Sequence, residues 1–174
     1  MQKKDFTLPK FICIGIAFVI VIGSLLHFTY EWSGNNLFVS FFAPVNESVW
    51  EHFKLGFFPI ILYGLLMFPL IKDKVNNYIF GLGFSSLILN TTIVSLYYLY
   101  TSFTHRSINW IDISIFIIGV IVAFVVFYKI LSLSSLPHFF NWIGLAIIVL
   151  TICLFIIFTI SPLTRFEIFK DPTS

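Results

Sequence analysis

Apolar residues along this sequence gather into five long runs that are separated by short polar segments. The runs cover about residues 11–30, 49–71, 78–100, 110–131 and 139–160. A helix rises ~1.5 Å per residue and the hydrocarbon core of a bilayer is ~30 Å thick, so about 20 apolar residues suffice to cross it. The pattern predicts an all-α integral membrane bundle of about five transmembrane helices, which forms a single domain over residues 1–174.

The composition agrees with this pattern. Hydrophobic residues make up 59% of the chain and charged residues only 10%, whereas soluble domains carry about 25% charged residues. Membrane lipid is therefore the expected partner that covers the surface. The net charge of +2 and the absence of a long basic run give no indication of a nucleic-acid partner.

The distribution of lysine and arginine predicts the orientation of the bundle. With the N-terminus inside, six basic residues lie on the cytoplasmic side and four on the outer side: Lys3, Lys4, Lys10, Lys72, Lys74 and Lys129 against Lys54, Arg106, Arg165 and Lys170. Cytoplasmic loops are enriched in such residues, so we expect the N-terminus inside and the C-terminus outside. The outer loop 32–48 has an apolar centre too short to span, and we expect it to lie partly in the interface.

Ionisable side chains are concentrated at the predicted outer ends of the helices. The main candidates for a ligand or metal site are His27, Glu31, Glu47, Glu51 and His52. Histidine and glutamate four residues apart share one helix face, and ionisable groups in or beside lipid are costly unless they pair or function. Secondary candidates are Asn46, Lys54, Asn90, His105 and Asp112.

Several of these residues also have a structural interpretation. Ser48 and Glu51 fit a capping box at the start of the second span, and Lys54 could neutralise a nearby glutamate. Asn90 lies in the third span, where polar side chains usually hydrogen-bond between helices. His105 lies beside Arg106 in a loop, which is typical of a solvated residue.

Three functions are compatible with the polar group. The first is binding of a cation or small polar ligand in an outward-facing pocket, as a transporter component or accessory subunit. The second is a membrane-embedded metal-dependent hydrolase or transferase acting on a lipid or cell-envelope substrate, with Glu47 or Glu51 as general base. In that case His27 or His52 is a ligand of a divalent metal such as zinc. The third is a structural scaffold for a membrane protein partner. Whether the chain is an enzyme stays open.

Two sequence blocks carry a resemblance. The first runs from His27 to Gly34 as H-F-T-Y-E-W-S-G, and the second from Pro44 to Lys54 as P-V-N-E-S-V-W-E-H-F-K. Together they resemble the signature of an uncharacterised family of small bacterial multi-pass membrane proteins, H-x-x-Y-E-W-S-G followed by P-V-N-E-S-x-W-E-H-x-K. The resemblance implies a bacterial cytoplasmic membrane and places the outer polar residues in the signature, and it implies no activity.

Overall fold

The computed structural model describes residues 8–171, and this part of the chain is helical without any strand. The elements are α1 Leu8–Trp32, α2 Leu37–Ser40, α3 Val49–Ile71, α4 Tyr78–Thr104, α5 Asn109–Ser132, α6 Phe139–Ile160 and the short 3-10 helix η1 Glu167–Phe169. In the described range, five of these helices are long and apolar enough to cross a membrane. The predicted all-α class with five candidate spans is confirmed.

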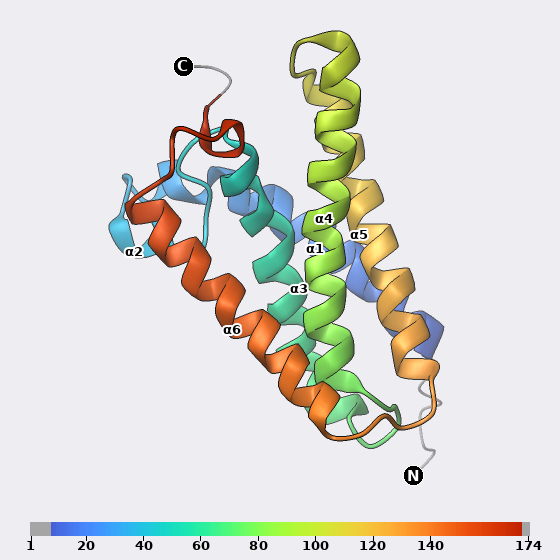
Figure 1. Cartoon of the computed structure of the whole chain (residues 1–174). Helices are drawn as coiled ribbons and strands as arrows, with labels where there is room; N and C mark the ends of the chain where they lie inside the picture. Colours follow the sequence, from blue (N-terminus) through green and yellow to red (C-terminus); the bar gives the residue numbers. More distant parts are fainter. Residues whose placement is uncertain (1–7, 172–174) are drawn as a thin grey trace.

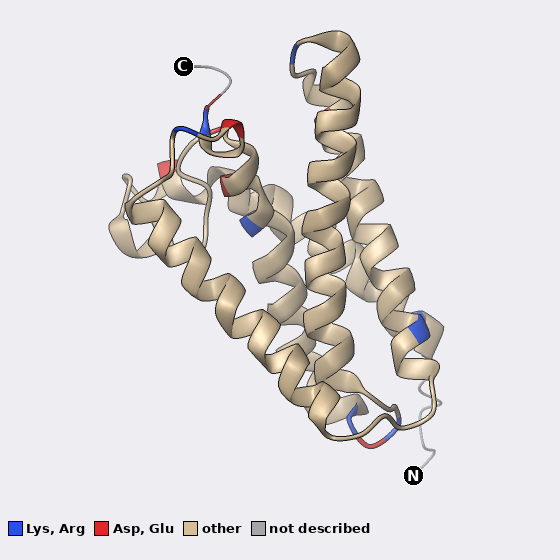
Figure 2. Cartoon of the chain, in the orientation of Figure 1, with Lys and Arg blue, Asp and Glu red and all other residues tan. Residues whose placement is uncertain are grey.

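The five long helices run alternately in opposite directions, so their ends form two groups (Figure 1). We call the end that contains Trp32, Val49, Thr104, Asn109 and Ile160 the polar end, and the other the opposite end. Charged residues lie mostly toward the two ends of the bundle, and most of the ribbon between them belongs to uncharged residues (Figure 2). This distribution is expected for a bundle whose middle lies in hydrocarbon, where charges are costly.

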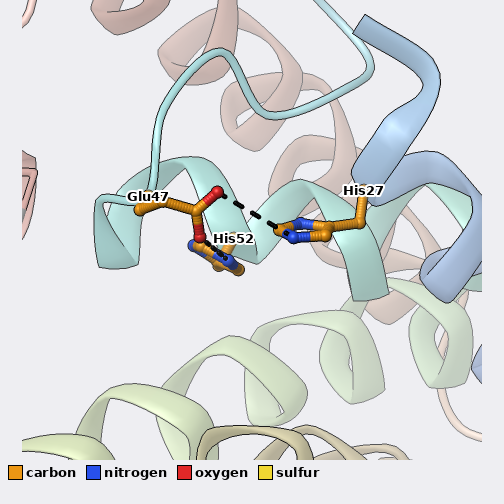
Figure 3. Close-up of side chains that lie close together, drawn as sticks. All are labelled: His27, Glu47 and His52. Carbon is orange, nitrogen blue, oxygen red and sulfur yellow. Dashed lines mark ion pairs between the residues drawn. The ribbon is translucent and has the colours of Figure 1, made fainter. Parts of the chain in front are cut away.

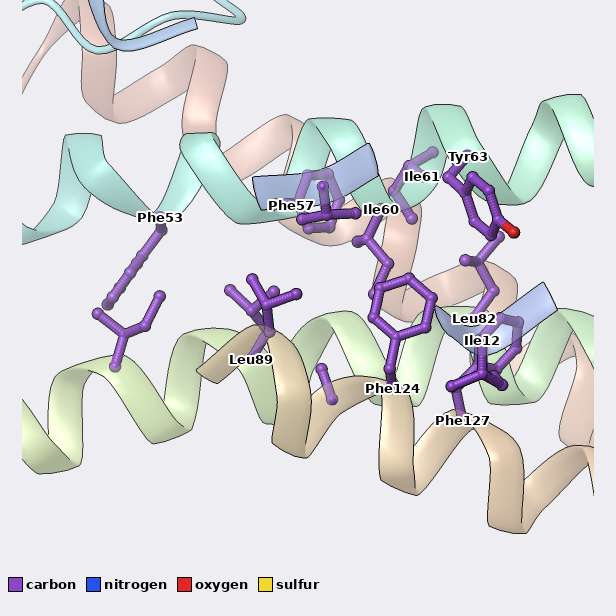
Figure 4. Packing of buried hydrophobic residues seen from close by; sticks show 14 of the residues in the cluster. Ile12, Phe53, Phe57, Ile60, Ile61, Tyr63, Leu82, Leu89, Phe124 and Phe127 are labelled. Atoms are coloured by element: carbon purple, nitrogen blue, oxygen red, sulfur yellow. The ribbon is translucent and has the colours of Figure 1, made fainter. Parts of the chain in front are cut away.

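Helix α3 is the most buried of the five spans and α6 is the least buried. The side chains of Phe57 and Ile60 on α3 have no exposed surface, and they pack among residues of the neighbouring helices such as Leu89 and Phe124 (Figure 4). The core is therefore built around α3. Because α3 starts at the polar end, its first turns are packed into the core beside the candidate site residues, as the buried side chains of Val49 and Phe53 show.

Helix α6 meets α4 near the opposite end and diverges from it toward the polar end (Figure 1). The close approach depends on two glycines: a Cβ on Gly83 would lie 2.2 Å from the carbonyl oxygen of Gly144, and a Cβ on Gly144 would lie 2.4 Å from that of Ile79. Small residues commonly allow such backbone contact between membrane helices. Larger residues would force these two helices apart.

Aromatic side chains attach the chain after α6 to the polar end. We call residues 161–171 the tail. The ring of Phe169 lies 5.0 Å from that of Trp50 on α3 and 5.1 Å from that of Phe158 on α6, measured between centroids. Trp50 also lies 5.3 Å from Phe158. These contacts hold the tail across the ends of α3 and α6.

Candidate metal centre

The link between α2 and α3 ends in a tight, hydrogen-bonded turn that positions Glu47. The side-chain oxygen of Asn46 accepts from the backbone nitrogen of Ser48 at 3.0 Å. The Ser48 hydroxyl in turn accepts from the backbone nitrogen of Glu51 at 3.4 Å and is the N-cap of α3. The Ser48 half of the predicted capping box is present, whereas the Glu51 carboxylate accepts from the backbone nitrogen of Val45 at 3.0 Å and not from that of Ser48. Glu47 lies between Asn46 and Ser48, so these hydrogen bonds fix its backbone while its side chain faces α1.

Three predicted site residues from separate elements come together at the polar end. His27 is on α1, Glu47 precedes α3, and His52 is in the first turn of α3; their side chains point toward one another (Figure 3). Oε1 of Glu47 lies 3.9 Å from Nε2 of His27, and Oε2 lies 3.3 Å from Nε2 of His52. One ligand atom from each residue lies within 4.8 Å of the other two.

The contacts of His52 determine which of its nitrogens carries a proton. Its Nδ1 lies 2.9 Å from the carbonyl oxygen of Ser48, which can only accept, so Nδ1 must donate. In a neutral imidazole Nε2 is then an acceptor, yet it faces a carboxylate oxygen of Glu47 at 3.3 Å. Two acceptors attract each other only with a cation between them. Either His52 is an imidazolium, or a metal ion joins it to Glu47.

The spacing of the group is close to that of a zinc site. Ligands at ~2.0–2.1 Å from a tetrahedral zinc ion lie about 3.3 Å from one another. The His52–Glu47 distance already has this value, and the His27–Glu47 distance exceeds it by about half an ångström. These distances reach different oxygens of Glu47, and the three ligand atoms lie within 4.8 Å of one another, so the side chains would still have to move closer to surround an ion. The Ser48 carbonyl supplies the outer hydrogen bond that zinc-binding histidines usually make.

A cavity of about 240 Å³ adjoins the group and is lined by His27, Tyr30, Glu31, Pro44, Val45, Asn46, Glu47 and Asp171. Among the described residues, its lining contains three carboxylates and no lysine or arginine. The hydrogen bond with His52 holds the pKa of Glu47 below its ordinary value of 4.5, against partial burial and the nearby charge of Asp171. Glu47 is thus ionised at neutral pH and able to bind a cation.

Glu51, another predicted ligand, is separate from this group. Its side chain is buried and forms an ion pair with Lys54, whose Nζ lies 2.6 Å from Oε2 of Glu51. The same Nζ donates to the hydroxyl of Thr159 on α6 at 2.6 Å and to the carbonyl oxygen of Ser40 on α2 at 2.8 Å. The second Glu51 oxygen accepts from Thr159 at 3.2 Å. This buried pair ties α2, α3 and α6 together.

The other secondary candidates lie apart from the His27–Glu47–His52 group. Asn90 is buried in α4, and His105 is an exposed residue with φ +52° that ends α4. Asp112 begins α5, where its carboxylate accepts from the hydroxyls of Tyr100 and Ser107, both at 2.5 Å. These contacts anchor the α4–α5 turn.

Sequence reasoning missed two residues of the polar end. Thr159 looks like an ordinary helix hydroxyl in an apolar run, and such hydroxyls usually bond to their own backbone. Asp171 is far from the other residues in sequence, yet it accepts from the backbone nitrogen of Glu47 at 3.3 Å and lines the cavity. Its proximity depends on the aromatic contacts of the tail, which no spacing in the sequence reveals.

Comparison with known proteins gives a family and no activity. The family described as "Family of unknown function (DUF6512)" matches residues 1–174, which is the whole sequence. No curated protein matches the chain, and no solved structure matches it. The match confirms the prediction, made from the two sequence blocks, that the chain belongs to an uncharacterised family. The chain belongs to the family of unknown function DUF6512.

Proposed function

We propose that this protein binds a divalent transition-metal ion, with zinc as the reference case, through His27, Glu47 and His52. The observation that carries the proposal is the convergence of three ligand side chains from separate elements, with the Glu47 carboxylate 3.3 Å from Nε2 of His52 and 3.9 Å from Nε2 of His27. His27 adds a second imidazole from a different helix. Convergence from α1, the loop and α3 distinguishes this group from a helix cap.

The mixture of ligands indicates the kind of ion. Two imidazoles and one carboxylate suit zinc and similar transition metals, whereas calcium and magnesium prefer oxygen ligands alone. The cavity beside the group is lined by acidic and neutral side chains, which favours the entry of a cation. The site therefore has the ligand types and the electrostatic character of a zinc-binding site.

The location of the site suggests its use. The distribution of lysine and arginine favours a polar end on the outer face of a bacterial cytoplasmic membrane. There the protein would capture metal ions from outside the cell, as a transporter component or an accessory subunit.

A metal-dependent hydrolase or transferase is the second candidate. One observation favours it: the group offers three protein ligands beside an open cavity of about 240 Å³, as catalytic zinc sites do. In this case Glu51 is a poor general base because its carboxylate is already paired with Lys54. Hydrolysis of lipid or cell-envelope esters by the zinc-loaded protein, but not by the metal-free protein, would favour this alternative.

The test is metal analysis of the full chain, purified in detergent through a tag without histidine. We expect one zinc ion per chain in the wild type after equilibration and removal of free metal. His27→Ala, His52→Ala and Glu47→Gln should each lower the affinity at least about tenfold. The chain has two further histidines, so His105→Ala and His138→Ala are matched controls that should bind like the wild type.

The outcomes separate the hypotheses. Loss of zinc in the three site variants together with normal binding in both controls supports the proposal. A wild type that binds no zinc, or control variants that lose as much zinc as the site variants, would refute it. If zinc does not bind and the site variants are simply less stable, the polar group is structural and the scaffold function remains.

A further inference from the structure

The tail reaches the candidate metal centre from the far end of the sequence. Phe169 is buried against Trp50 and Phe158, and two residues later Asp171 accepts a hydrogen bond from the backbone nitrogen of Glu47 at 3.3 Å. The aromatic contacts thus deliver a carboxylate to the same short loop that carries a proposed metal ligand.

Asp171 also shares a cavity with two of the three ligands. It lines the space of about 240 Å³ together with His27 and Glu47. An ion held by those two residues would adjoin the space that Asp171 lines, although the Asp171 carboxylate is outside the group of ligand atoms that lie within 4.8 Å of one another. Zinc takes four ligands, and aspartate oxygen is among the common ones.

Electrostatics links the position of the tail to the ion. The Asp171 carboxylate accepts from the backbone nitrogen of Glu47 and lines the same cavity as the Glu47 side chain, so two carboxylates adjoin one space. In the described part of the chain, no lysine or arginine lines the cavity between them. A divalent cation attracts two carboxylates at once, so an ion between Asp171 and Glu47 would hold the tail against the loop.

We infer that Asp171 is an additional ligand of the metal centre, directly or through one water, and that metal binding fastens the tail over the site. This inference rests on the proposed function. Linkage makes it quantitative: if Asp171 increases metal affinity tenfold, the bound metal must favour the docked tail by the same factor. The metal affinity and the extent of tail docking therefore report the same coupling free energy between the metal ion and the tail.

The first measurement is zinc affinity of the full chain. Asp171→Asn keeps the size of the side chain and should weaken zinc binding about tenfold, within the range seen for supporting groups of metal sites, while the stoichiometry stays at one. Glu167→Gln is the matched control. It removes one negative charge from the same tail at an exposed residue that pairs with Lys170 and does not line the cavity, and it should bind like the wild type.

The second measurement is tail docking, followed by trypsin cleavage after Arg165, an exposed residue of the tail. Saturating zinc should slow cleavage of this bond about tenfold in the wild type, and should have little effect in Asp171→Asn. Mass spectrometry identifies the cleaved bond and separates it from cleavage after Arg106, which should not respond to zinc.

Each result has one meaning. If the wild type binds one zinc and Asp171→Asn binds it equally well, with no effect of zinc on cleavage after Arg165, the role of Asp171 is refuted and the metal centre stands. Equal weakening by Asp171→Asn and Glu167→Gln would also refute it, because the effect would be one of general charge. If the wild type binds no zinc, the proposed function itself fails.

Discussion

Replacement of Lys54 by methionine should destabilise the protein more than any other single change at the polar end. The side chain of Lys54 has no exposed surface, and its Nζ donates to Glu51, Thr159 and the carbonyl oxygen of Ser40 at 2.6–2.8 Å. Methionine has a similar length but leaves the Glu51 carboxylate buried without its counter-ion. Breaking a buried ion pair in this way costs about 3–5 kcal/mol.

Removing both charges should cost less than removing one. In Lys54→Met combined with Glu51→Gln, no uncompensated charge remains, and the amide can still accept from the backbone nitrogen of Val45 as Glu51 does at 3.0 Å. We therefore expect the double variant to be at least about 1 kcal/mol more stable than Lys54→Met. Lys129→Met, at an exposed position of α5, is the matched control and should change stability by less than about 0.5 kcal/mol.

The free energy of unfolding can be measured by denaturant titration in detergent micelles, with helix content followed by circular dichroism. The reasoning fails if Lys54→Met loses less than about 1 kcal/mol. It also fails if the double variant is less stable than Lys54→Met, because the cost would then come from lost packing and not from an unpaired buried charge.

Three further predictions concern other parts of the molecule. Zinc affinity should fall at least about tenfold between pH 7.5 and pH 5.5, because the imidazoles of His27 and His52 bind a metal ion only through a nitrogen that carries no proton. The hydrogen bond with His52 holds the pKa of Glu47 below its ordinary value, so this carboxylate stays ionised over that range, and isothermal titration at each pH measures the affinity. Gly144→Ala should reduce the free energy of unfolding by about 1–3 kcal/mol or more, because its Cβ would lie 2.4 Å from a carbonyl oxygen of α4; Leu150→Ala on the exposed face of α6 is the comparison. Asn77→Ala should lower the midpoint of thermal unfolding and Asn77→Gly should lower it less, because Asn77 has φ +58° and its side chain bonds the backbone of residues 130, 134 and 136.

The helices were predictable because the hydrophobic pattern alone determines them. A run of about 20 apolar residues has few alternatives in lipid, and α3 begins and ends at the residues predicted for the second span. The hydrophobic pattern predicts the end of a helix less precisely where the helix continues beyond the apolar run. Helix α4 extends to Thr104, four residues beyond the expected end of the third span at Tyr100. Contacts between helices, such as that of Gly83 with Gly144, depend on the tertiary structure, and no periodic pattern in the sequence predicts them.

The site was predictable in part. His27, Glu47 and His52 meet because α1 packs against α3 and the long link between them, residues 33–48, brings Glu47 to the start of α3. Glu47 precedes the N-cap Ser48 and lies outside the helix, so its spacing of four residues from Glu51 does not put the two side chains on one face. Glu51 is buried toward α6, where it pairs with Lys54. The contribution of Asp171 depends on the path of the tail, which the aromatic contacts of Phe169 determine.

The central claim is that two imidazoles and a carboxylate hold one ion, and X-ray absorption at the zinc edge of the loaded protein tests it most directly. The claim predicts a first shell of about four nitrogen and oxygen atoms at ~2.0–2.1 Å, with the outer-shell scattering of two imidazole rings that disappears in part in His27→Ala. A shell that contains sulfur, or six oxygens without any imidazole scattering, would contradict it.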